Sequence, residues 1–88
     1  MKPRVLNRCR VCGLEQEEPP WGDDGLTPSF DLCACCGVEF GYEDSTPQST
    51  RKYRSEWIAN GARWFAHKFK PQDWNLEGQL QHIPAEYR

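Results

Sequence analysis

The chain has 88 residues, of which 38% are hydrophobic, and its formal net charge is −2 at pH 7. We therefore expect one domain over residues 1–88, and the small negative charge excludes a general electrostatic attraction to nucleic acid. Chains of this size are marginal on hydrophobic burial alone, so a further source of stability is expected.

No targeting or membrane signal is visible. Residues 1–10 are polar and basic rather than a hydrophobic signal segment, and no apolar run approaches the length that spans a bilayer. We therefore expect no membrane partner and a cytoplasmic, reducing location, in which thiols bind metals more often than they form disulfides.

Charge is distributed unevenly along the chain. Residues 1–50 hold four Lys/Arg and nine Asp/Glu, a net charge of −5, whereas residues 51–88 hold seven Lys/Arg and four Asp/Glu, a net charge of +3. The two halves either attract each other or face different partners.

Two matched cysteine knuckles lie in the first half, at residues 9–13 (Cys-Arg-Val-Cys-Gly) and 33–37 (Cys-Ala-Cys-Cys-Gly). Each is a C-x-x-C pair followed by glycine, which readily adopts the positive φ that such a turn often needs. Two such pairs supply four thiolates, the set that a tetrahedral zinc ion prefers. The spacing predicts one structural Zn²⁺ with the ligands Cys9, Cys12, Cys33 and Cys36.

The remaining cysteine and the chemistry of the site leave other uses open. Cys35 is the spare thiol by spacing, and we expect a small buried side chain, although a reactive redox pair with Cys36 is an alternative. A catalytic metal is disfavoured because His67 and His82 are distant in the chain. No Ser/His/Asp grouping, phosphate loop or H-E-x-x-H motif is present, so we expect no catalytic residue and no enzyme.

Short strands are expected around the knuckles. Val5 and Leu6 precede the first knuckle, and apolar residues alternate with polar ones before and after the second knuckle, at Phe30, Leu32, Val38 and Phe40. Strand, knuckle and strand, twice over, predict a zinc ribbon at residues 1–44. The stretch 14–29 is rich in proline, glycine and acidic residues and predicts an exposed loop.

Residues 45–88 predict a helical part. Pro47 suits a first helical turn, and an aromatic stripe follows at helical spacing, which predicts a helix of about 18–20 residues. Its expected core residues are Trp57, Ile58, Trp64 and Phe65. Asp73 would cap a shorter helix that carries Leu76, Leu80 and Ile83 on one face. The fold class is thus a small metal-bound α+β fold, with a zinc-ribbon N-terminal half with short strands packed against one long and one short C-terminal helix.

The stretch 33–44 (Cys-Ala-Cys-Cys-Gly-Val-Glu-Phe-Gly-Tyr-Glu-Asp) resembles the small bacterial cysteine-rich proteins named for a Cys-Pro-Cys-Cys motif. The likeness extends to the later tryptophan-rich stretch with Trp57, Gly61 and Trp64, while Ala34 stands in place of the motif's proline. The resemblance implies zinc binding. Some of these proteins are encoded near toxin systems as suspected immunity proteins, so it also implies a protein partner.

Two functions of different class are therefore considered. The first is a non-catalytic zinc-binding interaction protein that binds another protein through an exposed loop containing Trp21, Asp23 and Asp24, with packing of Trp21 over the knuckles as the alternative. The second is a nucleic-acid-binding zinc ribbon. Its contacts would come from Arg4, Arg8, Arg10 and the helix basics Arg51, Lys52, Arg54, Arg63 and Lys68.

Overall fold

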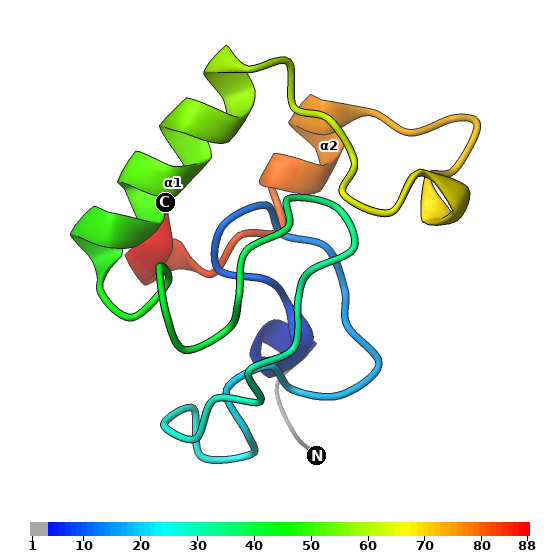
Figure 1. Cartoon of the computed structure of the whole chain (residues 1–88). Coiled ribbons are helices and arrows are strands. Elements are labelled where there is room, and N and C mark those ends of the chain that lie inside the picture. The colour runs from blue at the N-terminus through cyan, green and yellow to red at the C-terminus, as the bar shows by residue number, and fades with distance from the viewer. Residues whose placement is uncertain (1–3) are drawn as a thin grey trace.

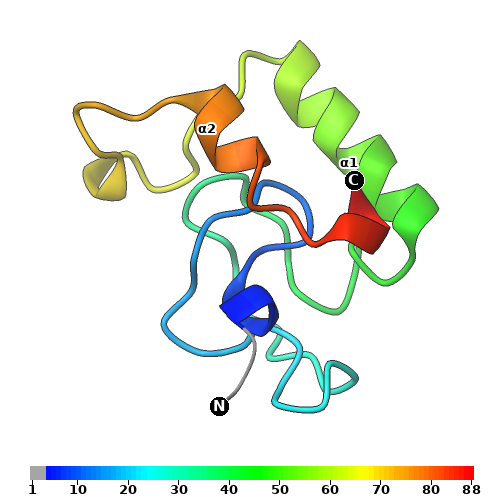
Figure 2. The same cartoon turned by 180° about the vertical axis from the view of Figure 1, so that it is seen from behind.

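The computed structural model describes residues 4–88, with side chains from Leu6 onward. Helix α1 spans Pro47–Ala59 and helix α2 spans Leu76–Leu80, and short 3-10 helices span Arg4–Asn7, His67–Phe69 and Ala85–Tyr87. Both helices lie on one side of the two knuckles, and the loop between the knuckles extends away from them on the other side (Figures 1 and 2). No helix among the described residues is long and apolar enough to cross a membrane.

The expected α+β fold with a strand-bearing zinc ribbon is wrong. Within residues 4–88 there is no β-strand, and each knuckle is closed by one isolated antiparallel bridge, between Arg8 and Glu15 and between Leu32 and Glu39. The pairing stops early at the second knuckle because Phe30 (φ 64°) and Gly41 (φ 103°) leave the extended conformation. The predicted strand at Val5 and Leu6 lies instead in the 3-10 helix Arg4–Asn7.

Helix α1 begins where the sequence predicts. Thr46 is its N-cap and Pro47 its first residue, and Ser49 completes a capping box in which each side chain accepts a hydrogen bond from the other residue's backbone N–H. This arrangement satisfies two of the backbone donors that a helix N-terminus leaves unpaired.

Helix α1 is shorter than the predicted 18–20 residues because it ends in a Schellman motif. Gly61 has φ +102° and its N–H donates to the Ile58 carbonyl at 3.0 Å, while the Ala62 N–H donates to the Trp57 carbonyl at 2.8 Å. The chain then turns, so the aromatic stripe is divided. Trp57 and Trp64 are buried, but Ile58 and Phe65 are 39% and 61% exposed, which contradicts their predicted core positions.

Helix α2 matches the predicted short helix, with a different cap. The Asn75 side chain, rather than Asp73, accepts a hydrogen bond from the Gly78 N–H at 2.7 Å. Leu76 and Leu80 pack against the core, and Ile83 beyond the helix is buried.

The core is built around the cysteines. The buried core cluster contains all five thiols and six further residues, namely Val11, Val38, Phe40, Trp57, Ala62 and Trp64. Trp74 packs on this cluster and meets Trp64 edge to face, with ring centroids 5.7 Å apart. A metal centre would therefore lie at the middle of the fold.

Candidate metal centre

The two knuckles have the same backbone geometry. In the first, the Gly13 N–H donates to the Cys9 carbonyl and the Cys9 N–H donates to the Leu14 carbonyl, both at 2.9 Å. In the second, the Gly37 N–H donates to the Cys33 carbonyl and the Cys33 N–H donates to the Val38 carbonyl, again at 2.9 Å. Each C-x-x-C-G segment therefore forms a closed turn that fixes the separation of its two sulfurs.

The structure brings Cys9, Cys12, Cys33 and Cys36 together, with all four Sγ atoms within 4.8 Å of one another. The Sγ atoms of Cys9 and Cys36 are 3.7 Å apart, as are those of Cys12 and Cys33. A tetrahedral zinc ion with Zn–S distances of about 2.3 Å separates its sulfurs by about 3.8 Å. The four side chains are at most 5% exposed and form no disulfide, so this donor set fits a closed metal site.

The thiols also have the electrostatics of a cation site. Hydrogen bonds from Cys12, Cys36 and Cys9 lower the pKa of the Cys33 thiol, whereas burial raises the pKa of Cys12 and of Cys36. A bound cation must displace the protons that burial favours on Cys12 and Cys36, so binding depends on pH. A bound Zn²⁺ would neutralise the thiolates and contribute folding free energy.

The C-terminal half lies directly against both knuckle glycines. A Cβ on Gly13 would come within 2.4 Å of the Gln79 carbonyl oxygen in α2, and a Cβ on Gly37 would come within 3.1 Å of the Phe65 ring. Both glycines also have positive φ, +85° and +78°. They therefore serve the turn and allow the close contact with residues 65 and 79 at the same time.

Arg54 of α1 ties the first knuckle to the C-terminal segment. Its guanidinium donates to the Val11 carbonyl at 2.6 Å, to the Arg10 carbonyl at 3.0 Å and to the Tyr87 carbonyl. Arg54 is among the basic residues predicted to contact nucleic acid, but its guanidinium is hydrogen-bonded within the protein. No local pattern identifies this role, because the partners lie more than 30 residues away.

Two further side chains hold the second knuckle. The Tyr53 hydroxyl donates to the Cys36 carbonyl at 3.1 Å, and burial followed by nearby thiolate charge raises the pKa of Tyr53 to about 12, which keeps it a neutral donor. The Gln79 amide donates to the Cys12 carbonyl at 3.1 Å and to the Cys35 Sγ at 3.3 Å. Gln79 therefore links α2 to both knuckles.

Cys35 lies outside the four-sulfur cluster and is 0% exposed, as expected for the spare thiol. Hydrogen bonds from Cys12 and Gln79 lower its pKa against the effect of burial. Its backbone carbonyl accepts the Phe65 N–H at 2.9 Å. Cys35 thus joins the second knuckle to the segment after α1.

Trp21 packs near the knuckles instead of projecting outward. The Arg10 guanidinium lies 3.9 Å from the Trp21 ring centroid and 4.4 Å from that of Tyr87, and the Trp21 indole N–H donates to the Asp44 carboxylate at 2.8 Å. Asp44 is fully buried and also accepts the Gly41 N–H. In the sequence, the only signal for Asp44 is an acidic residue beside a predicted helix start.

The two acidic loop residues, Asp23 and Asp24, differ in their structural surroundings. Asp24 accepts hydrogen bonds from the Leu26 N–H at 2.8 Å and the Thr27 hydroxyl at 3.1 Å, and these lower its pKa. This is a turn-forming role. Asp23 is exposed in the same loop. The role of Trp21, Asp23 and Asp24 in binding a partner stays a prediction.

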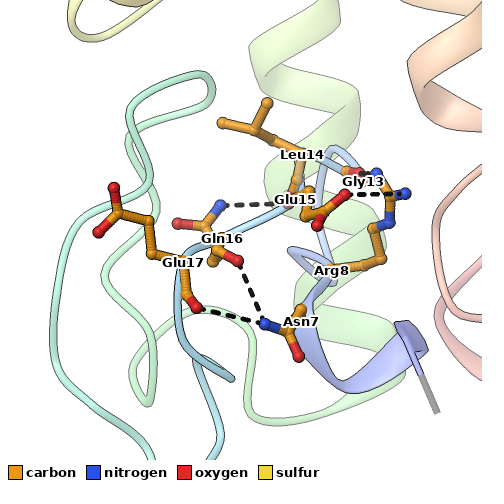
Figure 3. A network of polar contacts seen from close by, with 7 residues as sticks. All are labelled: Asn7, Arg8, Gly13, Leu14, Glu15, Gln16 and Glu17. Carbon is orange, nitrogen blue, oxygen red and sulfur yellow. Dashed lines mark hydrogen bonds and ion pairs between the residues drawn. The ribbon is translucent and has the colours of Figure 1, made fainter.

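The N-terminal arginines proposed for nucleic acid are engaged within the protein. Arg8 forms an ion pair with Glu15 at 3.3 Å and donates to the Gly13 carbonyl at 3.4 Å (Figure 3). Arg10 donates to the Gly25 and Asp44 carbonyls. The side chain of Arg4 lies outside the described residues. Arg8 and Arg10 therefore act in the fold around the first knuckle.

The chain is 30% identical over 74 residues to a Bacillus subtilis (strain 168) protein whose name is "Uncharacterized protein YozI", in a match that covers 66% of this chain and 61% of the relative. The chain thus spans less than two thirds of that protein's length. No protein-family model and no solved structure matches the chain.

Proposed function

We propose that the chain is a non-catalytic binding module in which one structural Zn²⁺, held by Cys9, Cys12, Cys33 and Cys36, positions loops that bind a basic protein. The metal assignment is supported by the 3.7 Å sulfur separations and the burial of all four thiols. Four cysteines leave no open coordination position, which fits a structural ion better than a catalytic one.

The observation that supports a basic partner is an acidic groove on the knuckle loops. It has a volume of about 450 Å³, and its walls carry the carboxylates of Glu17, Glu18 and Asp31. None of the three forms an ion pair within residues 4–88, and the Glu17 carboxylate points away from the polar network that surrounds Arg8 (Figure 3). Three unpaired negative charges therefore face the solvent together.

Apolar side chains complete the groove. Pro19 and Pro20 line it, Phe40 is buried at it, and Leu32 is 49% exposed. Lysine and arginine side chains combine a charged head with an apolar stem, so a basic segment of a partner could place its stems on Leu32 and the prolines and its charges on the carboxylates. The groove therefore offers both carboxylates for the charged heads and apolar side chains for the stems of lysine and arginine.

The resemblance to the Cys-Pro-Cys-Cys proteins suggests what such a partner does. Neutralisation of a basic bacterial toxin by an acidic immunity protein would use this kind of complementary charge. We propose neutralisation of a toxin as the biological role of this binding module.

A pull-down from the native host with matched variants tests the proposal. A partner should be recovered by the zinc-loaded wild type and lost with the variant Glu17→Gln/Glu18→Gln/Asp31→Asn. A control that neutralises three exposed carboxylates elsewhere, at Glu56, Glu77 and Glu86, should retain it. The recovered protein should then bind directly when purified. Retention by the groove variant, or equal loss with the control, would refute the assignment.

A further inference from the structure

The segment 63–70 is basic and aromatic, and it is separate from the acidic groove. It contains Arg63, Lys68 and Lys70, and no acidic residue lies between Glu56 and Asp73. Its two phenylalanines, Phe65 and Phe69, are each 61% exposed, although large apolar side chains are usually buried.

The cations of this segment are available to a ligand. In the described part of the chain, Arg63, Lys68 and Lys70 have no carboxylate partner. Lys68 lies 5.2 Å from the Phe69 ring centroid and Lys70 lies 5.5 Å from that of Trp74. Arg8 and Arg10 differ, because their guanidinium groups donate to backbone carbonyls and Arg8 also forms an ion pair with Glu15.

The metal centre supports the base of the segment. The Phe65 N–H donates to the Cys35 carbonyl at 2.9 Å and the Ala66 N–H donates to the Ala34 carbonyl at 2.8 Å, so the segment is paired with the second knuckle. Beyond these two hydrogen bonds, the 3-10 helix His67–Phe69 lies at the edge of the molecule, away from the loop between the knuckles (Figures 1 and 2). Rings and cations are thus presented on a fixed support.

We propose that residues 63–70 bind single-stranded nucleic acid, with bases stacked on Phe65 and Phe69 and phosphates next to Arg63, Lys68 and Lys70. Exposed rings interleaved with cations are the combination that binds single strands without reading sequence. A duplex hides its base faces and would leave the rings without a partner, so single strands should be preferred. An anionic membrane would use the same charges, and the test separates the two ligands.

Fluorescence anisotropy with labelled 12-nucleotide oligo(dT) and oligo(U) tests the proposal on the zinc-loaded chain. With three phosphate contacts, log K should fall with log salt with a slope of about −2 between roughly 50 and 200 mM salt. Lys68→Gln/Lys70→Gln should reduce that slope to about −0.7. Phe69→Ala should weaken binding at least about fivefold, because stacking on a ring is worth that much per base.

Matched controls assign the effect to the segment. Arg51→Gln/Lys52→Gln removes the same charge from two exposed positions of α1 and should bind as the wild type does. The groove variant Glu17→Gln/Glu18→Gln/Asp31→Asn should also retain nucleic-acid binding. The proposal of nucleic-acid binding and the proposal of a basic protein partner can therefore be refuted separately. Circular dichroism confirms that each variant is folded.

Several outcomes would overturn the proposal. They are no binding at about 50 mM salt, equal loss with the α1 control, unchanged affinity in Phe69→Ala, or tighter binding to a matched duplex. Binding to phosphatidylserine vesicles but not to oligonucleotides would assign the segment to membranes instead.

Discussion

Replacing Gly13 with alanine would press a methyl group against the backbone of α2. Gly13 and Gly61 both have positive φ, +85° and +102°, and alanine in such a conformation costs about 1–2 kcal/mol at either position. At Gly13 the new Cβ would also lie 2.4 Å from the Gln79 carbonyl oxygen, whereas at Gly61 the nearest atom is the Arg63 side chain at 3.7 Å. The two substitutions therefore share the φ penalty and differ in the collision.

The collision should add about 1–3 kcal/mol, the usual cost of overpacking, because a backbone carbonyl cannot rotate away as a side chain can. We expect Gly61→Ala to lower the free energy of unfolding by about 1–2 kcal/mol and Gly13→Ala by about 2–5 kcal/mol. Denaturant unfolding at a fixed free zinc concentration, followed by tryptophan fluorescence, measures both. A difference between the two variants of less than about 0.5 kcal/mol would refute the close contact between α2 and the first knuckle.

The remaining predictions concern the metal ligands and Arg54. Cys36→Ser should unfold and should lose the one zinc per chain that metal analysis measures. Cys35→Ser should keep both its zinc and its fold. Equal zinc loss in the two variants would contradict the separation of Cys35 from the cluster. Arg54→Met should lower the free energy of unfolding by about 2–4 kcal/mol, because it removes several charged hydrogen bonds to carbonyls. Lys52→Met on the exposed side of α1 is its control, and similar losses in both variants in denaturant unfolding would rule out the internal role of Arg54.

The metal ligands could be predicted from the sequence because each pair of cysteines lies within one short turn. Two C-x-x-C-G turns fix the spacing of their own sulfurs, and the structure then brings the four predicted cysteines within 4.8 Å. The start of α1 was readable for the same reason, since Pro47 and the neighbouring hydroxyl residues act within one helical turn.

The predictions of a long helix and of strands were wrong where an apolar pattern continued although the backbone changed direction. Spacing carried the predicted helix through Trp64, but the Asn60-Gly61 pair ends it, and Trp64 reaches the core after the turn. Alternation around Phe30 and Phe40 predicted strands, yet the two flanks form a single isolated bridge, between Leu32 and Glu39, and no strand. Asn-Gly is a helix-stop signal that could have been applied. The contacts of Arg54 could not be predicted, because they depend on the tertiary arrangement.

The separations of the contacts along the chain suggest the order in which the protein folds. Each knuckle closes on itself over a few residues, the sulfur contacts join positions 21 and 27 residues apart, and the Gln79 contact with Cys12 joins positions 67 residues apart. Closing a longer loop costs more entropy, and long-range contacts slow folding. We therefore expect metal uptake to precede docking of α2, so that a newly made chain keeps α2 undocked until zinc is supplied.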